Sequence, residues 1–466
     1  MREEDKFLLS HLDFAGCMAY LLDIFWRTGP LGAMEILLRN AVIWVIFPLL
    51  LGTSIYFTFR LHFPQFCRIG GAFKMIVRSQ TSTGQMGSFA AVATIIGGNL
   101  GAGTIAGSAM AVSMGGAGAI FWMVAVAILG SVIKLASAAL GVFYQEKFHD
   151  QCVGGAMIYI RKGLNSPFLG FCYCLCLVGA SLTVGNLVQV HAFTASFTHA
   201  GVFVRFWGVL LLMLPAVPIL FGGLKRLSIF MSASVPVIGI AYIVFCIVGI
   251  VFLRDNLGPV IRNIFCDAFS WNAAGGGATG FFFARTLQAG ISRGLFATDI
   301  GLGLVAIAHG RIERENLSIA EHARRQGLIA LIAPILVAIL CAMTGILVLC
   351  AAPNLGSNAT QICIDTFSRA FSAPRAGYLI IPFVVYCFAL TTITAWAWFA
   401  EHAFKDPRWI TAFRIFFIAA MPMGALVHGT LPWQIADVCI DGLLLTNLFA
   451  LLRLRSRVAA IYNYAQ

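Results

Sequence analysis

The chain has 466 residues, of which 60% are hydrophobic and 11% are charged. Soluble domains carry about 25% charged residues, so the composition excludes a soluble enzyme, a disordered chain and a nucleic-acid-binding domain, despite a net charge of +12. It predicts an all-α polytopic membrane protein whose excess Lys and Arg residues collect in cytoplasmic loops.

Eleven candidate transmembrane helices are found when the chain is scanned with a window of about 19 residues. They lie near residues 40–58, 87–114, 116–143, 167–198, 203–221, 227–253, 277–308, 326–352, 376–401, 409–428 and 431–453. The N-terminal segment 1–39 shows no evident cleavable signal peptide, and residues 454–466 form a C-terminal tail. An odd number of spans places the two termini on opposite sides of the membrane.

The basic residues favour one orientation of these spans. Alternate loops, together with the C-terminal tail, hold roughly twice as many Lys and Arg residues as the opposite set, which includes the N-terminal segment. Because positive residues favour the cytoplasmic side, we expect a protein of the cell (inner) membrane with its C-terminus in the cytoplasm and its N-terminus outside.

Two spans are unusually rich in glycine. The first reads GGNLGAGTIAGSAMAVSMGGAG over residues 97–118, and the second reads AGISRGLFATDIGLG over residues 289–303. Glycine weakens a helix, and backbone freed from helical bonding in a bilayer is tolerated where it lines an internal site. Paired interrupted helices mark the substrate site in many transporters. The alternative is that the glycines only allow close helix packing.

The two glycine-rich spans open two units of five spans each, residues 87–253 and 277–453. Because five is an odd number, the second unit enters the membrane from the opposite side, which predicts an inverted repeat. The helix at 40–58 is then a peripheral addition.

The sequence lacks the motifs of two other classes of membrane protein, the zinc proteases and the ATP-driven pumps. It contains neither the HExxH motif of zinc proteases nor the P-loop of ATPases. The 13 cysteines include no CxxC pair and many lie inside apolar runs, which predicts inert buried thiols. A secondary transporter is therefore the leading interpretation, with a membrane-embedded enzyme or a passive channel as alternatives.

Four blocks of the sequence resemble the alanine or glycine:cation symporter family, the sodium:alanine symporters of bacteria and archaea. They are GAGTIAGSAMAVSMGGAGAIFWM at 101–123, VGGAMIYIRKGL at 153–164, SRGLFATDIGLGLVAIAH at 292–309 and TTITAWAWFAE at 391–401. The resemblance runs from about Gly87 to Asn447. It implies the leucine-transporter-type inverted-repeat fold and symport of small neutral amino acids, chiefly alanine and glycine, with sodium. It implies no cofactor besides sodium as the coupling ion.

The chain departs from the family pattern at several polar positions. Ala102 and Thr104 replace a Thr and an Asn of the family, Thr298 and Asp299 replace its Asn-Glu pair, and Ser137 replaces a Glu. These departures leave open a shifted substrate range or coupling ion.

An amino-acid substrate needs partners for both of its charged ends. Its carboxylate can bind backbone N–H groups of the run from Asn99 to Thr104, where Gly101 and Gly103 allow close approach and a half-helix begins. Asn99 and Thr104 could add side-chain hydrogen bonds. The alternative for Asn99 is a cap on the resumed half-helix.

Gln189 lies at a position that resembles a substrate contact of the family. Its amide oxygen can accept a hydrogen bond from the substrate ammonium group, and Asn186, on the same helix face, is a weaker second candidate. The alternative for Gln189 is an interhelical hydrogen bond.

Sodium prefers oxygen ligands, as calcium and magnesium do. In the fold that the resemblance implies, a sodium commonly sits between carbonyls of the first broken helix and hydroxyls of the eighth core helix, which here contains Thr391 and Thr392. Hydrogen bonding of these hydroxyls to their own helix is the alternative. Trp396, on the same face as Thr392, could limit the size of the substrate side chain. An interfacial position is the alternative for Trp396, and Trp398 fits that position better.

Charged residues inside spans usually pair or face a polar cavity. We expect Arg293 and Asp299 to form a structural pair, and Asp437 and Asp441 to share a helix face as a hydrated pair or a proton relay. Lys134 has no assigned partner. Proton coupling through Asp299 or the Asp437–Asp441 pair is therefore the rival to sodium coupling.

Overall fold

A computed structural model describes residues 45–78, 86–148, 151–197, 202–269, 277–314, 317–356, 359–373, 375–426 and 431–464. The expected N-terminal segment 1–39 and the first residues of the expected helix 40–58 lie outside these ranges. The chain divides into two compact units, Met1–Leu49 and Leu50–Gln466, and the contacts that matter for function lie within the second.

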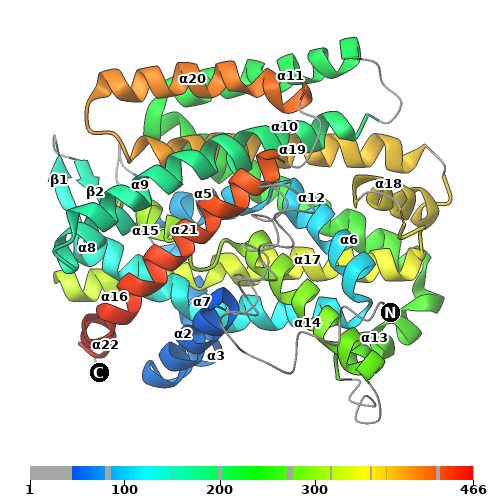
Figure 1. The fold of residues 1–466 in the computed structure, drawn as a ribbon, viewed down its shortest axis with the longest axis horizontal. Coiled ribbons are helices and arrows are strands. Elements are labelled where there is room, and N and C mark those ends of the chain that lie inside the picture. Colours follow the sequence, from blue (N-terminus) through cyan, green and yellow to red (C-terminus); the bar gives the residue numbers. More distant parts are fainter. Residues whose placement is uncertain are drawn as a thin grey trace, which may run out of the picture. The chain divides into compact units, whose positions relative to one another are not determined.

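The described part of the chain is almost wholly helical, as the composition predicted, with one small antiparallel β-hairpin (Figure 1). The elements are α2 (Phe47–Arg60), α3 (Pro64–Cys67), α4 (Ile69–Arg78), α5 (Ser88–Asn99), α6 (Ala102–Gly115), α7 (Gly118–Phe143), β1 (Glu146–Phe148), β2 (Gln151–Val153), α8 (Ala156–Gly163), α9 (Pro167–Leu182), the π-helix η3 (Thr183–Leu187), α10 (Val188–Ala195), α11 (Val202–Phe221), α12 (Gly223–Phe252), α13 (Arg254–Ala268), α14 (Gly277–Thr298), α15 (Leu304–His309), α16 (Ile319–Ala330), α17 (Ile332–Ala351), α18 (Ala359–Ala370), α19 (Ala376–Glu401), α20 (Pro407–Leu426), α21 (Leu431–Arg453) and α22 (Arg455–Asn463).

Within the described residues, eight helical segments are long and apolar enough to cross a membrane, or nine if α5 and α6 count as one bent span. Each of them coincides with an expected span, and α7 and α19 match theirs within two residues. The expected spans at 40–58 and 277–308 are not among the nine. Helix α2 has only 14 residues, and Arg285 and Arg293 lower the apolarity of α14.

Short amphipathic helices connect the long ones, and the sequence scan did not predict them. Helix α13, for example, buries Val260, Ile264 and Ala268, which recur every four residues, while most of its other side chains are exposed. This spacing gives an apolar stripe along one face. A window of about 19 residues averages such a stripe with its polar flanks and therefore misses it.

The connecting segments alternate between two ends of the helix bundle, as the expected path of the chain requires. At one end, Arg311 donates from Nη1 to Gln151 Oε1 (3.1 Å) and from Nε to His402 Nε2 (2.8 Å). These bonds join the segments that follow α7, α15 and α19. At the other end, the Ser113 hydroxyl donates to the carbonyl of Leu355 (2.7 Å). In Figure 1 the hairpin and α8 mark the first end, on the left, and α13 and α18 the second, on the right.

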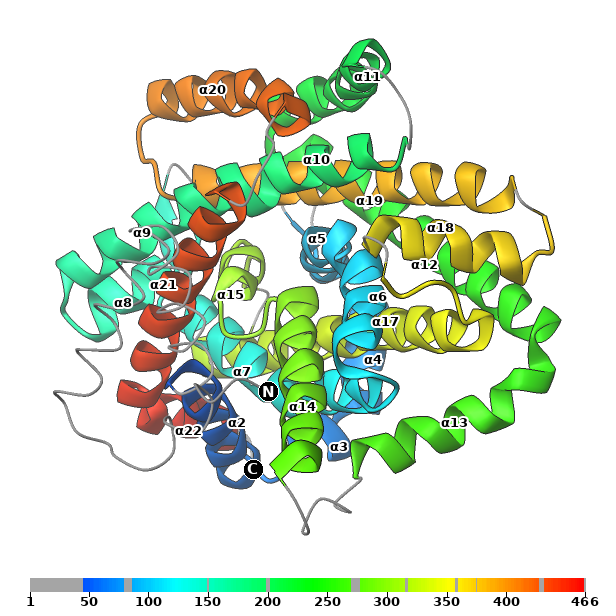
Figure 2. The same cartoon turned by 45° about the vertical axis from the view of Figure 1, so that its right-hand side comes forward.

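Both glycine-rich spans are broken, as predicted. Leu100 and Gly101 separate α5 from α6, and the two halves are bent by 47°. The segment 299–303 separates α14 from α15 and has positive φ at Asp299 (48°), Gly301 (88°) and Gly303 (80°). Left-handed backbone of this kind ends a helix. Helices α6 and α14 pack side by side, so the two broken helices adjoin each other (Figure 2).

Helix α9 passes into α10 through the π-helical turn η3. A π turn is wider than an α turn and often occurs at functional sites. Here it brings backbone close to α19, because a Cβ atom on Gly185 would lie 2.3 Å from the Cβ of Trp396. Only glycine allows this approach.

Candidate functional site

One face of α19 covers the carbonyl groups at the first helix break. Thr392 Oγ1 donates to the carbonyl of Gly97 (3.0 Å), and Trp396 Nε1 donates to the carbonyl of Gly98 (3.2 Å). Residues four apart lie on the same face of a helix, which is why one face provides both donors. Both carbonyls lie in the last turn of α5, where a helix leaves its carbonyls without partners of its own.

Thr391 lies beside the same break but directs its hydroxyl elsewhere. A Cβ on Gly97 would lie 3.4 Å from the Cβ of Thr391, while the Thr391 hydroxyl donates to the carbonyl of Phe388 in its own helix (2.9 Å). A hydroxyl has two acceptor lone pairs besides its donor, so both Thr391 and Thr392 still offer oxygen atoms to a cation.

Asn99 links the two broken helices directly. Its Nδ2 donates to the carbonyl of Thr298 (3.0 Å), the last residue of α14. The N-cap position of helix α6 is Gly101, which has no side chain to cap it. The Thr104 hydroxyl of α6 donates to the carbonyl of Asn99 at the end of α5 (2.6 Å). This bond joins the two halves of the first broken helix.

Gln189 lies against the backbone of the first break. A Cβ on Gly101 would come within 2.8 Å of both Nε2 and Oε1 of Gln189. Nε2 donates to the carbonyl of Val184 (3.0 Å), which belongs to the π-helical turn. Asn186 faces away from the break and donates to the carbonyl of Phe417 in α20 (2.6 Å). The structure therefore brings Gln189, but not Asn186, to Gly101.

Two aromatic side chains cover the breaks. A Cβ on Gly103 would lie 2.4 Å from Cε1 of Phe296, which comes from α14. Trp396 is only 1% exposed, so the alternative of an interfacial position for it is wrong. The same holds for Trp398, which is 4% exposed and packs its ring against His402. The sequence did not predict Phe296, because an apolar residue in an apolar helix carries no signal of its own.

The second break is held by two side chains that the sequence analysis missed. Asn447 Nδ2 donates to the carbonyl of Gly301 (2.6 Å), and the Tyr173 hydroxyl donates to the carbonyl of Leu302 (2.8 Å). Tyr159 in turn donates to Oδ1 of Asn447. An Asn within the apolar helix α21 was the available signal, because such residues usually have a buried polar partner.

The charged residues pair differently from the expectation. Lys134 and Asp299 are 3% and 8% exposed and interact electrostatically with each other, whereas Arg293 interacts with Asp437. The expected Arg293–Asp299 pair is therefore wrong. Asp441 interacts electrostatically with Asp437, so the expected acidic pair also lies in the field of Arg293.

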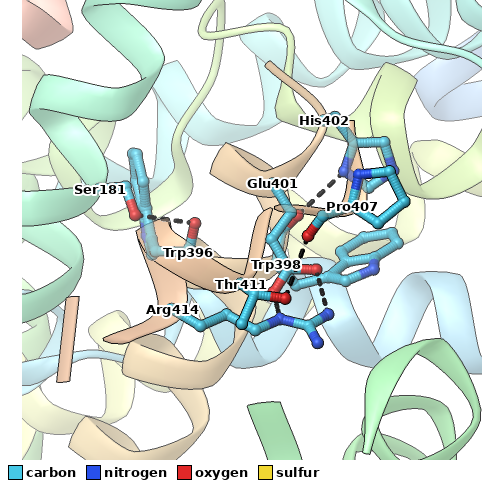
Figure 3. A network of polar contacts seen from close by, with 8 residues as sticks. All are labelled: Ser181, Trp396, Trp398, Glu401, His402, Pro407, Thr411 and Arg414. Atoms are coloured by element: carbon cyan, nitrogen blue, oxygen red, sulfur yellow. Dashed lines mark hydrogen bonds and ion pairs between the residues drawn. The ribbon is translucent and has the colours of Figure 1, made fainter. Parts of the chain in front are cut away.

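A polar network continues from the face of α19 that covers the first break to the C-terminal end of this helix (Figure 3). Ser181 donates to the carbonyl of Trp396 (2.9 Å). Glu401 accepts two hydrogen bonds from Arg414, both of 2.7 Å. Two parallel bonds of this kind fix the orientation of both groups. His402 Nδ1 donates to the carbonyl of Trp398 (2.9 Å).

The surroundings of His402 predict a pH dependence of stability. Burial, followed by the charge of Arg311, lowers the pKa of His402 well below its ordinary value. The folded protein then binds its proton less readily than the unfolded chain, so stability falls as the pH drops below the unfolded pKa of about 6.5, by at most about 1.4 kcal/mol per pH unit. We expect the melting temperature to fall less between pH 7 and pH 5 in His402→Gln than in the wild type. Parallel curves would contradict this assignment.

The described ranges contain no group of three His, Cys, Asp or Glu residues placed to hold a metal ion. The twelve cysteines there are free thiols, but they are not all buried as expected, since Cys67 and Cys266 are exposed. The candidate cation site at Gly97, Thr391 and Thr392 therefore offers neutral oxygen atoms only, a donor set that suits a hard monovalent cation better than a transition metal.

Comparisons with known proteins give a consistent result. The model of the sodium:alanine symporter family matches residues 33–466. An uncharacterized transporter of Haemophilus influenzae is 34% identical, over 87% of this chain and 90% of that protein. The sodium/alanine symporter AgcS of Methanococcus maripaludis is 30% identical, over 90% and 94% of the two chains. The probable sodium/glutamine symporter GlnT of Bacillus subtilis is 27% identical, over 92% and 90%.

Proposed function

The chain belongs to the sodium:alanine symporter family, and from this premise we propose that it is a secondary active transporter that imports alanine or glycine together with sodium. The observation that carries the proposal is the meeting of two broken helices, linked by the bond from Asn99 to Thr298 (3.0 Å). Unwound backbone inside a bundle of apolar helices is where transporters bind substrate and coupling ion. Relatives named for alanine and glutamine agree with a neutral amino acid.

We infer eleven spans arranged as two inverted five-helix repeats, residues 87–253 and 277–453. At the first break, Gly97 packs against Thr391 of α19 and Met231 of α12. These are the third helix of the second repeat and the last helix of the first.

The second break has the equivalent neighbours, which supports the inverted repeat. A Cβ on Gly303 would lie 3.0 Å from the Tyr173 hydroxyl of α9, and one on Gly301 would lie 3.3 Å from Leu444 of α21. These are the third helix of the first repeat and the last helix of the second. The segment 1–39, the peripheral helix 40–58 and the tail 454–466 complete the proposed organisation.

The substrate carboxylate is proposed to bind at the start of α6. The first N–H groups of a helix have no intrahelical acceptor and attract negative charge, and α6 begins without a side-chain cap. Gly101 and Gly103 leave this backbone without side chains of its own, and Asn99 and Thr104 fix its shape. Gln189, which lies against Gly101, would offer its amide oxygen to the ammonium group.

Sodium is proposed to bind between α5 and α19. The carbonyl of Gly97 and the hydroxyls of Thr392 and Thr391 supply oxygen ligands without formal charge, so binding adds one positive charge to the complex. An electroneutral amino acid carried with one sodium then moves one net charge, which a potential of 100 mV drives with about 2.3 kcal/mol. Transport should respond to the membrane potential.

The proposed orientation is supported by the loop charges and by one set of contacts in the structure. The segments after α7, α15 and α19, which belong to the basic set of loops, meet at one end through Arg311. We propose that this end faces the cytoplasm of a cell (inner) membrane, with the C-terminus on the same side and the N-terminus outside.

Radiolabelled alanine and glycine uptake into proteoliposomes tests the function. With the purified protein, a sodium gradient imposed alone should drive accumulation above the external concentration, and a potassium–valinomycin potential should increase it. Equilibration without accumulation would indicate a passive channel and overturn the proposal.

Proton coupling is a second candidate, and one observation favours it. Within the described residues, Oδ2 of Asp299 is buried without a hydrogen-bond partner, and Lys134 is its electrostatic neighbour. Uptake that persists without sodium, follows the pH gradient and is lost in Asp299→Asn would support this candidate. Sodium dependence in Asp299→Asn would exclude it.

Trp396 is expected to limit substrate size. Its ring is buried beside the first break, where its Nε1 donates a hydrogen bond to the carbonyl of Gly98 (3.2 Å). In Trp396→Leu we expect valine and leucine to inhibit alanine uptake several-fold more strongly than in the wild type, because the smaller side chain leaves apolar volume beside the ligand. Trp398→Leu is the matched control. Equal inhibition in the wild type and both variants would remove Trp396 as the size filter.

A further inference from the structure

A pocket of about 740 Å³ lies at the end of the helix bundle where Arg311 joins three segments. Its walls come from the β-hairpin, α8, the first half of α9 and the start of α20. This pocket lies away from the two helix breaks: no residue proposed to bind the amino acid or sodium lines it. Figure 3 shows part of its rim, with Glu401, His402 and Pro407.

One wall of the pocket is apolar and continues onto the outer surface of the bundle. Phe171 and Leu175 of α9 line the pocket and are each 64% exposed. Ile410 of α20 lines it from the other side. In a polytopic membrane protein, exposed apolar side chains on spanning helices face lipid. Trp409, also exposed, stands at the start of α20, where tryptophan marks the membrane–water interface.

The opposite wall is basic. Arg161, Arg311 and Lys405 line it together with Glu146 and Glu401. Each carboxylate has a basic partner that does not line the pocket. Glu146 contacts Lys162 (2.9 Å), besides the lining residue Arg161 (2.7 Å). Glu401 contacts Arg414. In the described part of the chain, Lys405 makes no ion pair or hydrogen bond.

We propose that this pocket binds one anionic phospholipid, with its phosphate at Arg161, Arg311 and Lys405 and an acyl chain along Phe171, Leu175 and Ile410. Basic pockets between spanning helices on the cytoplasmic side recognise anionic headgroups. A soluble phosphate compound would use the basic wall but gain nothing from the apolar wall. A zwitterionic lipid would bring an ammonium group against the basic residues.

The bound lipid is placed to affect transport. Arg311 follows α15, the short half-helix after the second break, and its guanidinium also bonds to Gln151 and His402. A phosphate at Arg311 would therefore hold α15 against the segments that follow α7 and α19. This effect rests on the proposed transport function, whereas binding of the lipid can be measured without it.

Native mass spectrometry of the purified full-length protein tests the binding. Phosphatidylglycerol or phosphatidylcholine is added to the detergent-solubilised protein, and the fraction carrying one lipid is measured. We expect preferential retention of phosphatidylglycerol, and about fivefold weaker retention in Lys405→Gln, since one basic residue near a membrane surface contributes roughly that factor. Arg408→Gln is the control, because Arg408 is exposed in the same segment but does not line the pocket.

A second variant tests the apolar wall. Ile410→Trp fills the acyl-chain position without changing charge and should also weaken phosphatidylglycerol binding, while a monodisperse elution profile confirms its folding. Equal retention in the wild type and Lys405→Gln would overturn the proposal. So would displacement of the lipid by soluble glycerol phosphate at similar concentration, or equal retention of phosphatidylcholine.

Discussion

Thr392→Ala is expected to raise the sodium concentration for half-maximal uptake by about tenfold, which corresponds to the loss of about 1.4 kcal/mol. The hydroxyl of Thr392 is the side-chain oxygen directed at the carbonyl of Gly97 (3.0 Å). Its removal takes one ligand from a site that has only neutral ligands. Thr391→Ala should have a smaller effect, because its hydroxyl donates within its own helix. Sodium titration of alanine uptake in proteoliposomes measures both.

Thr392→Ser is the matched control, because it keeps the oxygen and removes only a methyl group. It should retain a sodium dependence close to that of the wild type. If Thr392→Ala and the wild type share the same half-saturating sodium concentration, the cation does not bind at this hydroxyl, and the proposed site between α5 and α19 is wrong.

Lys134→Met is expected to lower the stability of the folded protein, because it removes the positive charge that acts on the buried carboxylate of Asp299. The effect should appear as a lower melting temperature of the purified protein. The double variant Lys134→Met/Asp299→Leu removes both charges and should recover most of the loss.

The double variant also decides between a pair and two independent residues. Destabilisations that simply add would mean that Lys134 and Asp299 do not interact, whatever their separation. Partial recovery of stability without recovery of transport would show that the pair also has a role in the transport cycle. This second result would favour the proton-coupled candidate.

The sequence predicted those elements whose signal is local. A span of about 20 apolar residues and a run of glycines are both visible within one window. This is why nine of the eleven expected spans coincide with helices long and apolar enough to cross a membrane, and why both helix breaks are observed. Helices such as α8, α13 and α18 were missed because each is shorter than the window and contains charged residues beside its apolar ones.

The pairing of side chains could not be predicted in the same way. Arg293 and Asp299 seemed natural partners because they are the charged residues of one helix. Asp299, however, lies just beyond the end of α14 and has a positive φ (48°), so its side chain does not continue the helical face of Arg293. The charges that act on the two residues, Asp437 on Arg293 and Lys134 on Asp299, come from helices that only the tertiary fold brings near.

The neighbours of the first break were predicted where a motif or a helical spacing indicated them. Thr392 and Trp396, four residues apart, do face the break together. Phe296 was missed because its role depends on shape: it occupies the space that Gly103 leaves without a side chain. A contact between two residues so far apart in sequence leaves no periodic pattern in either segment.

The π-helical turn between α9 and α10 holds one residue more than a regular helix would need, and this residue serves the contact with α19. Deleting one residue from Thr183–Leu187 would restore regular α-helical geometry and leave the flanking helices nearly in phase, because a π turn absorbs its extra residue as a local bulge. The bulge itself would be lost, and with it the close approach of Gly185 to Trp396. A homologue that lacks one residue here is therefore expected to keep the path of α9 and α10 but to have a different backbone beside the first break.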